Sequence, residues 1–294
     1  MSMKRREFLA AGLALNFSSA AVALAQQGGA TPDRARSGGG AGGAAPRRMA
    51  KTTKMFKSPG LYPNALAVMT DAPGGLWIGQ QKVTAQNAQT YNLPVDPDRD
   101  EDAWLVDWNG KLLKTVKTHS RNTSGMAYGN GFIWMGANAA PQGIFQTDMS
   151  SKTITHRQIP LGPKENGGGC HGVEYVNGKL WIAALRLRGI LRVDAKTWEP
   201  ELLIPYSAPR AHGSAFDKDA VWLVTGDERG AGLVKYDATT GRPLEIVEFG
   251  EDACDPHGLA WHNGVLYSCD AGIHPGWPEN KSPTHGYVFK IEIA

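Results

Sequence analysis

The feature that most constrains the fold of this chain is a short motif that recurs along it. The motif reads HGVEYVNGKLWIA at residues 171–183, HGSAFDKDAVWLV at residues 212–224 and HGLAWHNGVLYSC at residues 257–269, with weaker copies from Asn64 and Ser124. Each copy is an apolar segment, a turn and a second apolar segment that carries Trp or Tyr. In three copies the turn is Asn-Gly, which tolerates the positive φ of a two-residue hairpin. Each copy therefore predicts a β-hairpin.

Further strand-like segments follow the hairpins and extend each one to four strands. A third segment ends in Asp and small residues, as in GILRVDAKT, and a fourth follows, as in PELLIPY. Four strands that recur about every 40–60 residues are the signature of a β-propeller blade. The first strands begin near residues 64, 124, 171, 212 and 257. The sequence thus predicts an all-β protein, a β-propeller of five four-stranded blades, with six blades as the alternative.

The last predicted blade lacks a fourth strand, because only the segment GYVFKIEI follows its hairpin. The segment at residues 51–58 lies before the first blade and is available to fill that place. Pairing of the N- and C-terminal strands would close the ring and remove an open sheet edge. We therefore expect residues 51–294 to form a single propeller domain, and the 41% of hydrophobic residues is enough to build its core.

The N-terminus has the pattern of an export signal. Residues 1–27 begin with basic residues, continue in a modest apolar run and end near the small-x-small sequence Ala-Leu-Ala. The pair Arg5 and Arg6, followed by Glu-Phe-Leu, resembles a twin-arginine signal, with an ordinary Sec signal as the alternative. Residues 28–50 are rich in Gly, Ala, Pro and Arg and predict a disordered linker. We expect a periplasmic or secreted protein without membrane insertion after cleavage, because no other stretch is long enough to span a membrane.

The net charge and the cysteine content indicate which kinds of binding partner and cross-link to expect. Much of the net charge of +3 comes from the N-terminus, so no nucleic-acid partner is expected. A propeller can stand alone, and we expect a monomer whose partner is a small-molecule substrate. The three cysteines are too few for a disulfide scaffold. Cys170 and Cys254 lie near motif histidines and could be metal ligands, a redox pair, a disulfide or buried small residues, whereas Cys269 is expected in the core.

Three histidines occupy the same position in the repeat: His171, His212 and His257 each open a predicted first strand. The first strand of a propeller blade lies nearest the axis, so these imidazoles are expected to gather at one end of it. There they would repel one another if protonated and need donors if neutral. A divalent metal removes both problems, and we predict a three-histidine site for zinc, iron, calcium or magnesium. In the alternative, structural interpretation, each imidazole caps a neighbouring loop.

Two long connections, residues 80–102 and 270–285, reach the same end of the predicted propeller and would shape a site there. Candidates for general acid, general base and oxyanion partner lie on or near this end. The catalytic candidates are His274, His285, Glu279, Arg210 and Tyr62, and Asp255 is among further acidic residues ahead of the last blade. The remaining histidines, expected on outer strands or turns with structural roles, are His119, His156 and His262.

The repeat pattern over about residues 55–294 resembles the propeller superfamily that includes streptogramin lyase, gluconolactonase-type lactonases and the lyase that cleaves peptidyl-hydroxyglycine. In the last of these, three histidines from different blades hold a catalytic metal at the axis, and the resemblance implies that role for the three motif histidines. In streptogramin lyase, a divalent metal and a late His/Glu/His set drive ring opening by elimination. His274, Glu279 and His285 match that set in residue type but not in spacing, and these relatives have more blades.

These features together predict a periplasmic metal-dependent lyase. The metal would act as a Lewis acid on a substrate carbonyl or hydroxyl, and Arg210 or Tyr62 would steady the developing oxyanion. Two alternatives stay open. The same site could serve a metal-dependent hydrolase or lactonase, or a redox-metal oxygenase, which metal identity would separate. Alternatively, the propeller is a non-catalytic module that binds a ligand or a protein, because the fold alone does not define the function.

Overall fold

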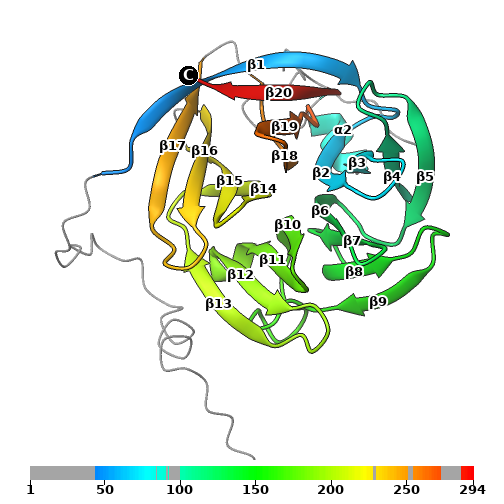
Figure 1. Ribbon diagram of the computed structural model, residues 1–294. Coiled ribbons are helices and arrows are strands. Elements are labelled where there is room, and N and C mark those ends of the chain that lie inside the picture. Colours follow the sequence, from blue (N-terminus) through cyan, green and yellow to red (C-terminus); the bar gives the residue numbers. More distant parts are fainter. Residues whose placement is uncertain are drawn as a thin grey trace, which may run out of the picture. The chain divides into compact units, whose positions relative to one another are not determined.

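A computed structural model of the 294-residue chain describes residues 44–83, 85–90, 92, 100–227, 230–250, 254–272 and 286–294. All of them belong to one compact unit, Gly42–Ala294. Figure 1 shows this unit as an all-β arrangement of sheets around a common centre. The described strands are accompanied by the short helix α2 (Ala85–Thr90) and the 3₁₀ turn η1 (Leu185–Leu187). Within these residues, no helix has both the length and the apolar character needed to cross a membrane.

Three antiparallel four-stranded sheets follow one another along the chain, and their strands are adjacent in sequence order. The first sheet contains β2 (Pro63–Met69), β3 (Gly75–Gln80), β4 (Glu101–Val106) and β5 (Leu112–Thr118). The second contains β6 (Thr123–Gly129), β7 (Phe132–Ala137), β8 (Gly143–Thr147) and β9 (Thr153–Arg157). The third contains β10 (Cys170–Val176), β11 (Lys179–Ala184), β12 (Gly189–Asp194) and β13 (Pro200–Pro205). These sheets are the first three predicted blades.

A fourth sheet has eight strands in the order β14-β15-β16-β17-β1-β20-β19-β18. Four of them are β14 (Arg210–Asp217), β15 (Ala220–Asp227), β16 (Gly230–Asp237) and β17 (Pro243–Phe249). The other four are β18 (Leu259–His262), β19 (Val265–Cys269), β20 (Tyr287–Ile293) and β1 (Arg47–Lys57). Each half has the strand order of a blade. The described residues therefore form several four-stranded sheets that resemble propeller blades, as the repeat predicts.

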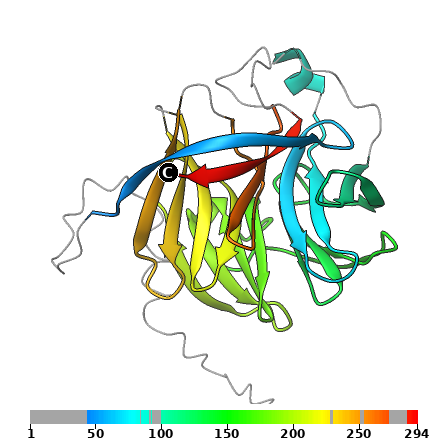
Figure 2. The same ribbon diagram turned by 45° about the horizontal axis from the view of Figure 1, so that its top comes forward.

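The N-terminal strand β1 joins the two halves of this sheet (Figure 2). It pairs antiparallel with β20, from Ala50 to Lys57, and its start pairs parallel with β17. The predicted pairing of the terminal strands is thus confirmed. The strand begins at Arg47, which corrects the predicted linker boundary at residue 50. Local composition gave no strand signal for Arg47 and Arg48, because their carboxylate partners, Glu248 and Glu245, lie on a strand far along the chain.

The Asn-Gly turns adopt the conformation that their sequence predicts. Both residues of each pair have positive φ, at 54° and 77° in Asn130-Gly131, 49° and 77° in Asn177-Gly178, and 49° and 83° in Asn263-Gly264. Positive φ at both central residues defines the hairpin turn that matches the twist of the flanking strands. The turns therefore set the register of three of the inner hairpins.

The hydrophobic core is divided into layers between neighbouring blades. The second strand of each blade contributes one buried aromatic residue, and each lies in a different core cluster. These residues are Trp77, Trp134, Trp181, Trp222 and Tyr267. Blade-to-blade packing therefore explains why the motif repeats Trp or Tyr at this position.

Glycine recurs in the motif because the first strands approach one another closely. A Cβ atom on Gly125 would lie 1.6 Å from the carbonyl oxygen of His171, and one on Gly213 would lie 2.3 Å from that of His257. The first strands contact one another in a closed cycle, β2–β6–β10–β14–β18–β2. The gap that remains between them at mid-axis is too small for a water molecule. The axis therefore has two separate ends.

The three cysteines are all free and buried. Cys170 and Cys254 lie in different inter-blade core clusters, so they do not form the disulfide that the sequence left open. Burial raises the pKa of all three thiols, which keeps them protonated and unreactive. The interpretation as buried small residues fits this structure.

Candidate metal centre at one end of the axis

Three of the residues that open the first strands bond the next blade at one end of the axis. Asn64 Nδ2 donates to Thr123 O at 3.1 Å and to Ser124 Oγ at 2.9 Å. His171 Nδ1 lies 2.5 Å from Ala211 O, and His212 Nδ1 lies 3.1 Å from His257 O. These bonds link successive blades, as the structural interpretation of the histidines predicts.

The three motif histidines also contact one another, as the repeat register predicts. The ring centroids of His171 and His212 are 4.2 Å apart, and those of His212 and His257 are 4.6 Å apart. Because a carbonyl can only accept, Nδ1 of His171 carries the proton, and Nε2 accepts from Asn138 Nδ2 at 2.9 Å. Both nitrogens of His171 are thus already hydrogen bonded within the protein.

Burial keeps two of these imidazoles uncharged. The pKa of His171 is lowered to about 4, mainly by burial and also by the nearby Arg210 and His257, against the opposing effect of the bond to Ala211. Burial, followed by the neighbouring His171 and His257, lowers the pKa of His212 well below its usual value. Neutral imidazoles add no positive charge of their own, so they would not repel a cation bound beside them.

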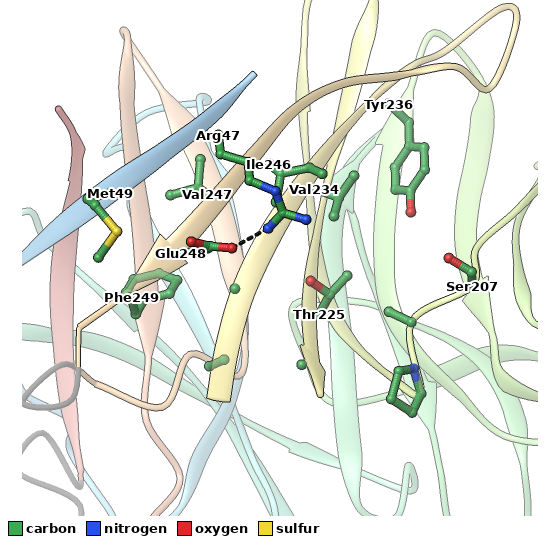
Figure 3. Close-up of a pocket in the computed structure, with 15 residues that line it drawn as sticks. Arg47, Met49, Ser207, Thr225, Val234, Tyr236, Ile246, Val247, Glu248 and Phe249 are labelled. Carbon is green, nitrogen blue, oxygen red and sulfur yellow. Dashed lines mark hydrogen bonds and ion pairs between the residues drawn. The ribbon is translucent and has the colours of Figure 1, made fainter. Parts of the chain in front are cut away.

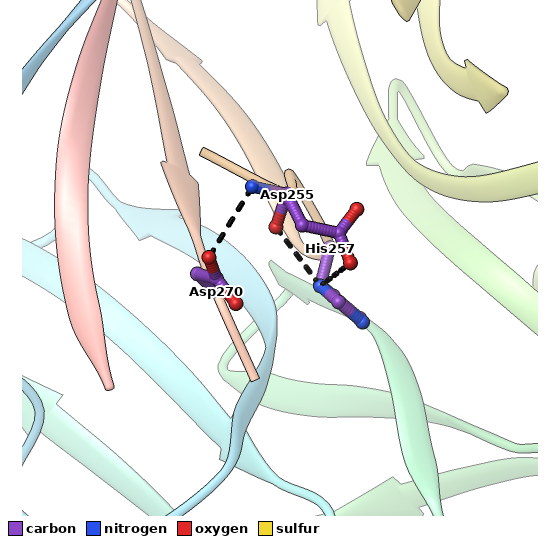
Figure 4. Close-up of side chains that lie close together, drawn as sticks. All are labelled: Asp255, His257 and Asp270. Carbon is purple, nitrogen blue, oxygen red and sulfur yellow. Dashed lines mark hydrogen bonds and ion pairs between the residues drawn. The ribbon is translucent and has the colours of Figure 1, made fainter. Parts of the chain in front are cut away.

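One group of potential metal ligands stands out among the described residues. Asp255, His257 and Asp270 each offer a ligand atom, and these atoms all lie within 4.8 Å of one another. All three side chains are buried, with exposures of 1%, 3% and 0%. Figure 4 shows them converging from the segment before β18 and from the residue that follows β19. Carboxylate oxygens and an imidazole nitrogen together suit a divalent cation.

The contacts of Asp255 leave one of its oxygens without a hydrogen bond. Oδ1 is held by Arg210 Nη1 at 2.5 Å, while Arg210 Nη2 donates to Pro256 O at 3.2 Å. Oδ2 is buried and has no hydrogen-bond partner among the described residues. His257 Nδ1 lies 3.7 Å from Oδ2 and is bonded to Asp255 O at 3.0 Å, a bond that a metal held through Nδ1 would replace. A buried carboxylate oxygen without a partner is costly, and a bound cation would satisfy it.

Asp270 is held by backbone donors. Its Oδ2 accepts the N–H of Asp255 at 3.2 Å and its Oδ1 accepts the N–H of Gly272 at 2.7 Å. These bonds tie the end of β19 to the segment ahead of β18, so that both carboxylates meet His257. The residues present thus fit a divalent metal by donor type, burial and an unsatisfied oxygen.

The other predicted site residues lie in different surroundings. Arg210 is at the centre, as expected, but it is paired with Asp255. Tyr62 is fully buried and packs with Val83 and Ala88 beneath α2, with a left-handed φ of 58°. Its catalytic role and the three-histidine ligand set stay predictions. The candidates His274, Glu279 and His285 lie outside the described residues.

The three histidines expected to be structural have packing or hydrogen-bonding roles. His119 Nδ1 bonds Thr153 Oγ1 at 2.9 Å. His156 stacks on Phe145, with ring centroids 4.1 Å apart, and His262 stacks on Trp108 at 4.5 Å. Their predicted structural roles are confirmed.

Sequence reasoning missed three polar residues at this end. Asp270 and Asn138 each follow a second strand, and Glu101 opens a third strand. Glu101 is buried and accepts the N–H groups of Asn122 and Thr123 at 2.6 and 2.9 Å, yet burial raises its pKa. Asp270 and Asn138 could have been predicted from the hairpin geometry, because in an antiparallel hairpin the end of the second strand lies beside the start of the first.

A separate cavity lies away from the axis and lacks a comparable group of metal-ligating side chains. It has a volume of about 390 Å³ and lies beside β1, β16 and β17 (Figure 3). Its two charged residues, Arg47 and Glu248, form an ion pair with each other. No His, Cys or Asp is among its described lining residues. The axis end is therefore the better candidate site.

Comparison with known proteins supports the fold. No protein-family model and no curated protein match the sequence. The structure is similar to glutaminyl cyclase from Myxococcus xanthus, with a TM-score of 0.58 and 9% identity over 85% of this chain and 98% of that one. A protein of unknown function from Bacteroides caccae has a TM-score of 0.48 and 13% identity over 79% of this chain and 78% of its own. At 9% identity, the likeness to the cyclase shows a propeller fold, and it does not single out streptogramin lyase.

Proposed function

We propose that the chain is a five-bladed, monomeric β-propeller enzyme of the periplasm that acts as a metal-dependent lyase on a small organic substrate. The proposed ligands of its divalent metal are Asp255, His257 and Asp270. The observation that carries the proposal is Asp255 Oδ2, which is buried and has no hydrogen-bond partner in the described part of the chain, inside a group of ligand atoms within 4.8 Å of one another. When bound, the metal supplies a Lewis acid that polarises a substrate carbonyl or hydroxyl.

The surrounding residues have roles that follow from their contacts. Arg210 bonds Asp255 Oδ1 and Pro256 O, so it orients the carboxylate and leaves Oδ2 for the metal. His212, whose ring packs edge-on against His257, lines the site as a neutral imidazole. His171 is fixed by Ala211 and Asn138 and serves to position His212.

The acid–base residues of the proposal are those that the sequence predicts. The connection that carries His274, Glu279 and His285 starts at Asp270, whose Oδ1 binds the N–H of Gly272. A ligand of the proposed metal therefore begins the connection that bears these groups. General acid–base work requires such groups within hydrogen-bond reach of the substrate.

A second candidate is cyclase activity on a glutaminyl substrate. The fold similarity to the Myxococcus xanthus glutaminyl cyclase, which extends over 98% of that chain, favours it. Closure of a glutaminyl residue onto its own amine releases ammonia, whereas elimination by a lyase leaves a new double bond. The two candidates therefore give distinguishable products.

The test is elemental analysis of untagged protein recovered from the periplasmic fraction without chelator, followed by a substrate panel. We expect about one zinc, calcium or magnesium ion per chain. Lactone or depsipeptide rings that open with a new ultraviolet-absorbing double bond would support the lyase, and ammonia from glutaminyl peptides would support the cyclase. Hydrolysis products would point to the hydrolase instead.

Other outcomes overturn the proposal. Stoichiometric iron or copper would instead indicate a redox enzyme. Protein that retains no metal, even after divalent ions are added back, would leave a binding module as the better interpretation. Protein found only in the cytoplasmic fraction would contradict export.

A further inference from the structure

The opposite end of the axis holds a second cavity. Its volume is about 290 Å³, and it is lined mainly by residues from the second half of each of the five first strands. The tightly packed glycines at mid-axis leave no room for water between this cavity and the metal centre. Any ligand in it therefore enters from the hairpin end and does not share the site proposed above.

One lining residue departs from the pattern of the repeat. Counted from the residue that opens each first strand, the fourth position is alanine in four blades and glutamate in the third. The alanines are Ala67, Ala127, Ala215 and Ala260, and all are buried. The glutamate is Glu174, in β10. The third blade therefore has a carboxyl group at a position where the other four blades have only the methyl group of alanine.

The carboxyl group of Glu174 has no protein partner to account for it. No hydrogen bond or ion pair joins it to the described residues, and no Lys or Arg is among the lining residues of the cavity. Burial raises its pKa well above the usual value. The side chain is half-buried, so its carboxylate is costly to ionise without a partner, and a cationic ligand would supply that partner and stabilise the ionised form.

Aromatic side chains line the same cavity as this carboxyl group. The next position of the repeat supplies Tyr128, Tyr175, Phe216 and Trp261, which all line the cavity. These rings are half-buried, so part of each side chain stays accessible. The hydroxyl of Tyr128 donates to Oδ2 of the exposed Asp71 at 2.8 Å, so a further carboxylate lies beside one of the rings. Aromatic faces with a carboxylate form the usual recognition site for an ammonium group.

We infer that this cavity binds a small organic cation, whose ammonium group pairs with Glu174 inside a cage of the four aromatic side chains. The volume suits a ligand of a few heavy atoms rather than a large metabolite. The ligand replaces the missing partner of Glu174 and gains cation–π contacts with the rings. Because the two ends of the axis are separate, this inference stands whether or not the proposed lyase activity is found.

The probe for this site is tetramethylammonium chloride, measured by isothermal titration against the full-length mature protein. Neopentyl alcohol, which has a similar shape and no charge, is the matched ligand control. Two variants test the carboxyl group: Glu174→Ala, which installs the residue of the other four blades, and Glu174→Gln, which keeps the size. Glu245→Gln, on the outer strand β17, is the control variant because its partner Arg48 is remote from the cavity.

We expect saturable binding of tetramethylammonium that weakens about tenfold or more in both Glu174 variants and is unchanged in Glu245→Gln. Neopentyl alcohol should bind about tenfold more weakly than the cation. Glu174→Ala should fold and have a higher denaturation midpoint than the wild type at neutral pH, which separates loss of binding from loss of structure. The inference is overturned if the cation does not bind saturably, if it binds the Glu174 variants as well as the wild type, or if the uncharged alcohol binds equally well.

Discussion

Replacing Gly125 with alanine is expected to destabilise the fold by about 3 kcal/mol or more, one of the two largest effects predicted here. The added Cβ would lie 1.6 Å from the carbonyl oxygen of His171 and 2.8 Å from the backbone nitrogen of Val173. Both are backbone atoms of the next blade's first strand, so no side-chain rotation relieves the clash. The blades must move apart, which opens the core between them. Equilibrium urea denaturation measures the change.

The matched control for this substitution is Gly250→Ala. Among the described residues, and apart from its chain neighbours, nothing lies within 4 Å of a Cβ built at Gly250, and its backbone does not require a left-handed φ. Its stability should stay within about 0.5 kcal/mol of the wild type. If Gly125→Ala were as stable as Gly250→Ala, the close approach of the first strands would be incorrect, and with it the separation of the two axis ends.

The second large effect is expected from Asp255→Asn, which should weaken divalent-metal binding by about 100-fold or more. Removal of even an outer partner of a metal ligand costs about 10–100-fold in affinity, and a direct ligand should cost at least as much. The amide also removes the negative charge that compensates Arg210. Titration calorimetry with zinc and with calcium measures the affinity, and circular dichroism checks that the fold persists.

Glu245→Gln serves again as the control, because it neutralises a carboxylate on an outer strand that is paired with Arg48 at 3.1 Å. Its metal affinity should match that of the wild type. Full metal affinity in folded Asp255→Asn would exclude Asp255 as a ligand. If His171→Ala abolished binding while Asp255→Asn did not, the three-histidine site would be the correct ligand set.

The architecture could be predicted because its signals are local and repeated. Asn-Gly at the hairpin turns, Trp or Tyr on the second strand and Gly after the first residue each follow from contacts made in the same way by successive blades. The first blade, β2–β5, departs from this pattern, because Ala65 occupies the position where the other four blades have glycine. An alanine fits at this position because the residue that faces it, Gly258, has no side chain. A Cβ on Gly258 would lie 2.6 Å from Ala65 C.

The site was harder to predict because its residues meet only in three dimensions. His257 was found from its place in the repeat, and Asp255 from its position ahead of the last blade. Asp270 was not predicted because it follows a second strand, and the repeat marks only the starts of first strands, although antiparallel pairing brings the two together. Glu174 lay inside the motif itself, where its departure from alanine becomes informative only when the fourth position is compared across all blades.

The pairing of β1 with β20 and β17 also has a consequence for how the chain folds. Arg47 and Glu248, which form an ion pair between β1 and β17, are 201 residues apart in sequence. Such non-local pairings form slowly, because the loop entropy is lost before the contacts are gained. During synthesis β1 emerges first among the described strands and must wait for β20, which emerges last. Until then β1 lacks its antiparallel partner, so this strand is vulnerable to intermolecular strand pairing, and its pairing with β20 ends that exposure.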